Sequence, residues 1–93
     1  MNSKQGGGKM AIYIEEKTKF GQVVLGRLKE LGRTQVWLSK ETGLTKVYIS
    51  QMCSDITKRP SFDAIFRIST ALDIEPSSLT TAVLEDQKNK REW

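Results

Sequence analysis

Apolar residues recur at intervals of three to four positions through residues 18–84, with polar residues between them. That period is typical of amphipathic helices, which bury one face and leave the other in water. Glycine and proline, which terminate helices, interrupt the pattern at short loops. The pattern therefore predicts five helices, at about 18–31, 35–42, 46–54 and 61–72, with a fifth from position 76.

The first three predicted helices have clear starts and stops. Thr18, Thr34 and Thr45 each precede a helix, where a hydroxyl can accept a hydrogen bond from a first-turn amide. Gly32 and Gly43 follow the first two helices, and glycine readily takes the left-handed conformation that ends a helix. The second and third helices are thus joined by a tight glycine-containing turn, which predicts a helix-turn-helix unit.

The fourth helix is expected to begin at Ser61, after a proline, and the fifth to begin at Pro76. The apolar stripe expected to be buried on the fourth helix consists of Phe62, Ile65, Ile68, Ala71 and Leu72. The apolar face of the fifth helix consists of Leu79, Ala82 and Val83. Both helices are therefore expected to contribute one apolar face each.

The two ends of the chain differ from its centre. Residues 1–17 contain a glycine triplet and predict a flexible tail or arm, within which residues 10–14 are compatible with a short strand. Residues 85–93 are highly charged and are expected to fray as a C-terminal tail. The predicted organisation is a single domain over 18–84 with a tail on each side.

Charge is distributed unevenly within a net charge of +4. Residues 18–59 carry eight Lys and Arg against three acidic residues, whereas 60–84 carry one Arg against three. A cluster of cations gains affinity for nucleic acid by releasing counterions from the phosphate backbone. The asymmetry favours one face that meets DNA and another that points away from it.

The rarer residue types exclude several classes of site. One cysteine, Cys53, and no histidine leave neither an internal disulfide nor a structural zinc site, and a single thiol fits a reducing cytoplasm. No apolar run has the length of a membrane span or a signal peptide. We therefore expect a soluble cytoplasmic protein with no metal, no cofactor and no membrane partner.

Several short motifs fall in register along the chain. They are Thr34-Gln35, Leu38-Ser39, Gly43-Leu44-Thr45, Ile49, Arg59-Pro60-Ser61 and Ala71-Leu72-Asp73-Ile74. Together they resemble the Cro/repressor (XRE-type) helix-turn-helix DNA-binding family over about 20–79. The resemblance implies an all-α, compact five-helix domain of the lambda-repressor-like type. The sequence departs from the family at Cys53, usually acidic, and at Asp55, usually glycine, which bears on how the chain leaves the recognition helix.

The resemblance also indicates which residues meet DNA. The recognition helix, about 45–54, enters the major groove with its first turns at the base edges. The candidates for base contact are Thr45, Lys46, Val47, Tyr48 and Gln51. Glutamine can bind adenine through two hydrogen bonds, lysine can reach guanine or a phosphate, and the apolar side chains can contact a thymine methyl. The candidates for phosphate contact are Thr34, Gln35, Lys58 and Arg59.

Several of these candidates have a purely structural alternative. The two threonines can be helix caps and nothing more. The lysines, the arginine and the glutamine can be solvated surface residues. Tyr48 can pack against the second helix instead of DNA.

A sequence-specific double-stranded DNA-binding transcriptional regulator is the function we expect, and a repressor is favoured because a short chain acts most simply by occupying a promoter. One recognition helix spans few base pairs, so we expect a homodimer with Leu79, Ala82 and Val83 at its interface. The alternative is that the fifth helix closes the core of a monomer.

Two other functional classes compete with this one. An antitoxin-type or other interaction module would bind a partner protein and autoregulate its own operon, with Val36, Trp37, Phe66 or Trp93 as the anchor. An enzyme is the weakest hypothesis, since there is no histidine, no nucleophile–base pair and no phosphate-binding loop between strand and helix. We therefore expect no catalytic residues.

Overall fold

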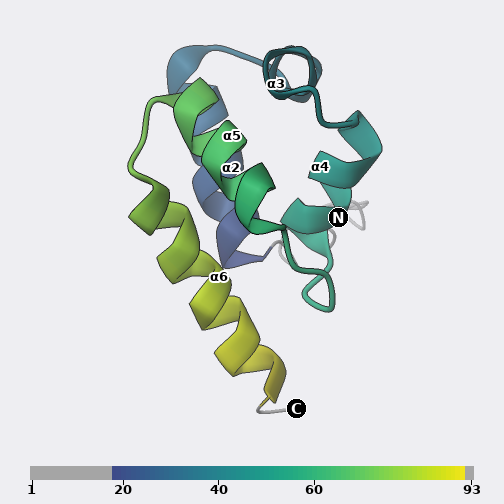
Figure 1. The fold of residues 1–93 in the computed structure, drawn as a ribbon, viewed down its shortest axis with the longest axis vertical. Coiled ribbons are helices and arrows are strands. Elements are labelled where there is room, and N and C mark those ends of the chain that lie inside the picture. The colour runs from purple at the N-terminus through teal and green to yellow at the C-terminus, as the bar shows by residue number, and fades with distance from the viewer. Residues whose placement is uncertain (1–17, 92–93) are drawn as a thin grey trace, which may run out of the picture.

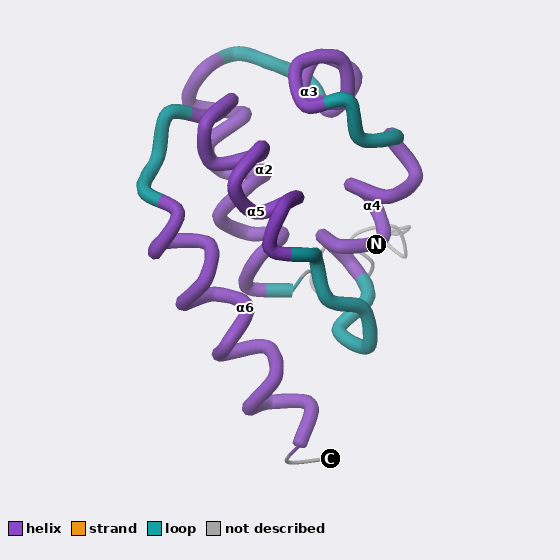
Figure 2. Tube along the Cα trace, viewed as in Figure 1, coloured by secondary structure: helices purple, strands orange, loops and turns teal. Residues whose placement is uncertain are grey.

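The computed structural model describes residues 18–91, with side chains through residue 88. Five helices follow one another: α2 (Lys19–Leu31), α3 (Gln35–Thr42), α4 (Lys46–Ser54), α5 (Phe62–Leu72) and α6 (Pro76–Arg91) (Figures 1 and 2). The described part of the chain contains no strand. The all-α, five-helix prediction is confirmed, while the predicted arm and the strand at 10–14 lie outside the described residues.

Helix α2 occupies the centre of the fold. It packs against α6 and α4 and also contacts α5, while α3 packs against α5 and α4. Figure 1 shows α3 and α4 on one side of the α2–α5 pair and α6 on the other, running toward the C-terminus. The helix-turn-helix unit thus forms one side of the domain. Helix α6 lies on the other side and packs against α2, which in turn packs against α4.

All five helices contribute side chains to one hydrophobic core. Its members are Phe20, Val24, Leu28, Leu38, Ile49, Met52, Cys53, Ile65, Ile68, Leu72, Leu79, Ala82 and Val83. Burying a large apolar side chain contributes about 1.5–3 kcal/mol. This core therefore fixes how α4 lies relative to the rest of the domain.

The predicted caps are present. The hydroxyls of Thr18, Thr34, Thr45 and Ser61 each accept a hydrogen bond from the backbone amide three residues later. Gly32 and Gly43 end α2 and α3 with φ angles of 68° and 78°. Asp73 ends α5 at φ 57°, a left-handed conformation that a residue other than glycine rarely adopts.

One expectation for α5 is wrong. Phe62 was expected in the buried stripe, but 83% of its surface is exposed. It is the first residue of α5, beside a stripe centred on Ile65, Ile68 and Leu72, and no other described element covers it. An apolar residue at the end of a helix can thus satisfy the helical period without being buried.

The predicted C-terminal tail is also corrected. Helix α6 continues to Arg91, so residues 85–91 are helical. Asp86, within this segment, is only 6% exposed. Its carboxylate accepts hydrogen bonds from backbone amides of α2, which explains why so polar a segment remains docked.

The proposed dimer interface is corrected for a related reason. Leu79, Ala82 and Val83 are 0%, 5% and 7% exposed within a single chain. They belong to the chain's own core, because α6 packs them against α2 and α5. The fifth helix therefore closes the core of one protomer, as in the monomer alternative.

Across residues 18–91, no helix combines the length and apolar character needed to cross a bilayer.

Candidate nucleic-acid interface

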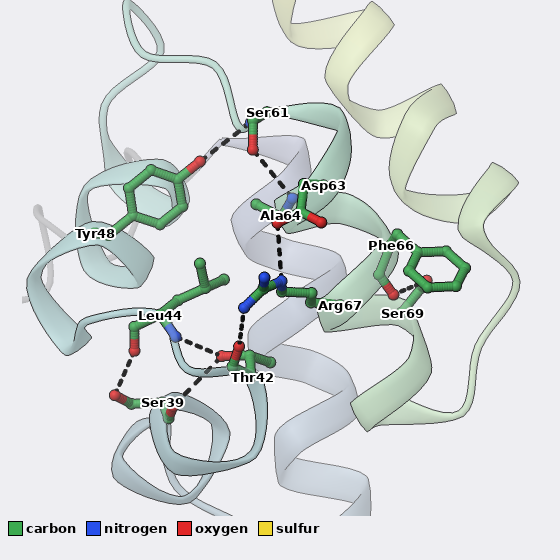
Figure 3. Close-up of polar contacts among 10 residues, drawn as sticks. All are labelled: Ser39, Thr42, Leu44, Tyr48, Ser61, Asp63, Ala64, Phe66, Arg67 and Ser69. Atoms are coloured by element: carbon green, nitrogen blue, oxygen red, sulfur yellow. Dashed lines mark hydrogen bonds and ion pairs between the residues drawn. The ribbon is translucent and has the colours of Figure 1, made fainter.

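The turn between α3 and α4 is fixed by side chains of α3 (Figure 3). The Ser39 hydroxyl donates to the Leu44 carbonyl, and the Leu44 amide donates to Thr42 Oγ1 at 3.2 Å. Thr42 Oγ1 in turn donates to the Leu38 carbonyl at 2.8 Å. Because Leu44 also packs against the core, these bonds fix the angle at which α4 leaves the turn.

Arg67 of α5 supports the same turn from the other side. Its Nη1 donates to the Thr42 carbonyl at 3.0 Å, and its Nε pairs with Asp63 Oδ2 at 2.8 Å (Figure 3). A cation near the C-terminus of α3 also complements the negative end of the helix dipole. Arg67 thus links α5 to the end of α3, a role that its place in the helical period of α5 does not reveal.

Tyr48 points toward α5. Its hydroxyl accepts a hydrogen bond from the Ser61 amide at 3.1 Å, and its half-buried ring packs against the core (Figure 3). The partner differs from the structural alternative, which placed Tyr48 against the second helix: here its hydroxyl contacts the start of α5. We leave Tyr48 out of the base-contacting set.

The exposed side of α4 carries the other helical candidates. Lys46, Val47 and Gln51 are all exposed, Val47 by 66%. Val47 and Gln51, four positions apart, lie one above the other on the helix surface. Lys46 is the first residue of the helix, beside Val47, and all three are on the side away from the buried Ile49 and Met52. The structure thus brings these three side chains together on a solvent-facing surface that we call the α4 face.

Each predicted phosphate-contacting residue lies at a helix start or in a loop. Thr34 and Thr45 are caps, since their hydroxyls accept from the amides of Trp37 (3.1 Å) and Tyr48 (3.0 Å). Both threonines remain exposed, and Gln35 is half-buried. Cap and DNA contact are compatible, because a hydroxyl that accepts one hydrogen bond can still donate another.

The loop between α4 and α5 exposes Lys58 and Arg59. Asp55 organises this loop by accepting from both the amide (2.9 Å) and the hydroxyl (2.6 Å) of Thr57. The hydroxyl bond, followed by the amide bond, holds the pKa of Asp55 below its usual value. Its backbone is extended, with φ −113°, so this exit from α4 does not require the glycine of the family motif.

Within the described residues, no three or more His, Cys, Asp or Glu side chains lie close enough together to hold a metal ion.

The family model described as helix-turn-helix, of the XRE type, matches residues 27–79, more than half of the chain. The chain belongs to the XRE-type helix-turn-helix family. The matched segment runs from within α2 through the α4 face to Leu79, which confirms the resemblance drawn from the sequence motifs. Proteins of this family are DNA-binding regulators. Neither the curated proteins nor the solved structures yield a match.

This helix-turn-helix domain also contains contacts that sequence reasoning missed, at the far end of the recognition helix. The Thr18 amide donates to the Cys53 carbonyl at 3.0 Å, and its hydroxyl donates to the Met52 carbonyl at 3.0 Å. Gly21 lies so close to α4 that an added Cβ would stand 2.8 Å from the Cys53 Cα. The cap signal at Thr18 was visible in the sequence, but its contacts to residues 34 and 35 positions away were not.

Proposed function

We propose that the chain is a sequence-specific double-stranded DNA-binding transcriptional regulator that acts as a repressor by occupying an operator. The observation that carries this proposal is the α4 face, where Lys46, Val47 and Gln51 are exposed on the recognition helix of an XRE-type domain. The contacts from Ser39, Thr42 and Arg67 support it, because they fix the helix that presents these side chains.

Each residue of the α4 face has a defined chemical role in this proposal. Gln51 forms two hydrogen bonds with an adenine, Lys46 reaches guanine acceptors or a phosphate, and Val47 contacts a thymine methyl. Thr45 donates its hydroxyl at the first turn. Phosphate oxygens are bound by the remaining polar candidates, Thr34, Gln35, Lys58 and Arg59, which set affinity and register without reading sequence.

In vitro selection of duplexes from random DNA at moderate salt, followed by footprinting, tests the proposal directly. We expect an enriched motif with two inverted half-sites about 34–36 Å apart, read by two copies of the chain. Failure to enrich any motif would contradict sequence-specific binding. A single half-site would contradict the two-copy arrangement but not the reading of bases by α4.

Replacing Gln51 with alanine should relax base preference at one position of the selected motif. The lost pair of hydrogen bonds corresponds to about 1–3 kcal/mol of discrimination, and preference elsewhere should remain. Competition binding against the four base substitutions at each position measures this. Thr81→Ala, at an exposed position on α6, is the control and should leave every base preference unchanged.

Replacing Arg59 with alanine should weaken binding to all duplexes alike. Loss of one phosphate contact reduces the slope of log affinity against log salt by about 1. Lys88→Ala removes the same charge from an exposed position on α6 and should leave the slope nearly unchanged. Equal slopes for the two variants would contradict a phosphate contact at Arg59.

A second candidate function is binding to a partner protein, as in an antitoxin. The observation that favours it is the exposure of Phe62 (83%) and Phe66 (59%), one turn apart on α5. Trp37, a predicted anchor, is only half-exposed and lies under the Arg33 guanidinium, 5.1 Å from its ring centroid. Co-purification with the product of the neighbouring gene in the same operon, tested with both proteins expressed, distinguishes this candidate.

A further inference from the structure

We propose that Asp86, at the far end of the chain, is a positioning residue for DNA recognition. Asp86 binds the first turn of α2, and this first turn binds the C-terminal end of the recognition helix, α4. The inference rests on the proposed DNA binding for its functional consequence, but its structural part stands on contacts within the chain.

The first link joins α6 to α2. Lys19 N donates to Asp86 Oδ1 at 2.8 Å, and Phe20 N donates to Asp86 Oδ2 at 3.1 Å. The carboxylate is buried, with 6% exposure. A negative group that accepts from two first-turn amides matches both the hydrogen-bonding need and the positive end of the α2 dipole.

The second link joins α2 to α4. Thr18 caps α2 by accepting from Gly21 N at 2.8 Å, and the same hydroxyl donates to the Met52 and Cys53 carbonyls at 3.0 and 3.1 Å. The Thr18 amide also donates to the Cys53 carbonyl, at 3.0 Å. One turn of α2 is therefore bound by a carboxylate of α6 and by the last carbonyls of α4.

The recognition helix needs this support because its exit is unusual for the family. The residue after its last turn, Asp55, is extended, so α4 ends without a left-handed residue to help satisfy its last carbonyls. Thr18 supplies donors to two of those carbonyls instead, immediately after Gln51 of the α4 face. If the first turn of α2 moves, the Met52 and Cys53 carbonyls lose the Thr18 donors, and the end of α4 is held less firmly.

Removal of the Asp86 charge has opposite expected effects on DNA affinity, depending on whether Asp86 acts only through its charge or by positioning α4. Asp86→Asn adds one unit to a net charge of +4, which by electrostatics alone strengthens attraction to DNA. If Asp86 positions α4, the same change weakens binding to the selected duplex. Asparagine has only one side-chain oxygen, and its NH2 group cannot accept a hydrogen bond from the second amide. Glu85→Gln is the matched control, since Glu85 is the adjacent, exposed acid on the same helix.

The experiment compares these two variants in the full chain at a temperature where circular dichroism shows both folded. We expect Glu85→Gln to bind the selected duplex and a scrambled duplex as tightly as the unmodified protein, or slightly more tightly. We expect Asp86→Asn to bind the selected duplex about tenfold more weakly, a change of one unit in log affinity, and the scrambled duplex with less change. Equal behaviour of the two variants, or an equal loss on both duplexes by Asp86→Asn, would overturn the proposal.

Amide hydrogen exchange provides a readout without DNA. Exchange at residues 53–55 should accelerate in Asp86→Asn and in Thr18→Val, and remain as in the unmodified protein in Glu85→Gln and Thr18→Ser. The double variant Asp86→Asn/Thr18→Val should show less than the sum of the single effects, since both act through one turn. Unchanged exchange at 53–55 would refute the structural link even if no operator is found, whereas failure to select any duplex would refute only the proposed function.

Discussion

Replacing Gly21 with alanine is expected to lower the free energy of unfolding by about 3 kcal/mol or more, a large part of the stability of a small domain. The added Cβ would overlap the backbone carbonyl of Cys53 and stand 2.8 Å from the Cys53 Cα. Backbone atoms cannot rotate away as a side chain can, so α2 and α4 must separate. That movement would also stretch the bonds from Thr18 to the end of α4.

Gly26→Ala is the control for this prediction. Gly26 lies in the same helix, is exposed, and has no atom within 4 Å of an added Cβ. Alanine there should raise stability by about 0.5–1 kcal/mol, because glycine is a poor helix former. Urea unfolding followed by circular dichroism measures both variants, and a Gly21→Ala protein as stable as Gly26→Ala would disprove the close approach of α2 to α4.

Local chemistry explains why most helix boundaries could be predicted. Thr34, Thr45 and Ser61 cap helices through amides only three residues away, and Gly43 ends α3 through its own backbone freedom. These interactions depend on neighbouring residues alone, so the sequence contains them in full. The same holds for the α4 face, because the helical period alone separates Lys46 and Gln51 from the buried Ile49.

Contacts between distant segments could not be predicted in this way. Asp86 is bound to α2 across 66 and 67 positions, and a charged residue in a charged segment gives no sign that it is buried. The Tyr48 hydroxyl bonds the Ser61 amide only because α4 and α5 meet at that point. An apolar stripe such as that of α6 is equally consistent with a core and with an interface, and only the packing of α2 and α5 decides between them. The contacts of the α4 face with DNA stay predictions.

Replacing Leu79 with alanine is the second change for which we expect a large effect, a loss of about 2–5 kcal/mol of stability. Leu79 is fully buried within one chain, so the change leaves a cavity between α6 and its neighbours. The loss should not depend on protein concentration, because the contacts are intramolecular. Leu84→Ala, on the same helix at 63% exposure, should change stability by no more than about 0.5 kcal/mol.

Concentration dependence separates this prediction from the interface hypothesis that the structure overturns. If Leu79 held two copies together, the urea midpoint of the unmodified protein would rise with protein concentration. The Leu79→Ala variant would then show no such rise. Urea unfolding at two concentrations a hundredfold apart makes the comparison. If Leu79 is a core residue, the midpoints of Leu79→Ala and the unmodified protein differ by the same amount at both concentrations. A difference that vanishes at the lower concentration would place Leu79 between protomers, and α6 would then have to pack against α2 less closely than its buried side chains indicate.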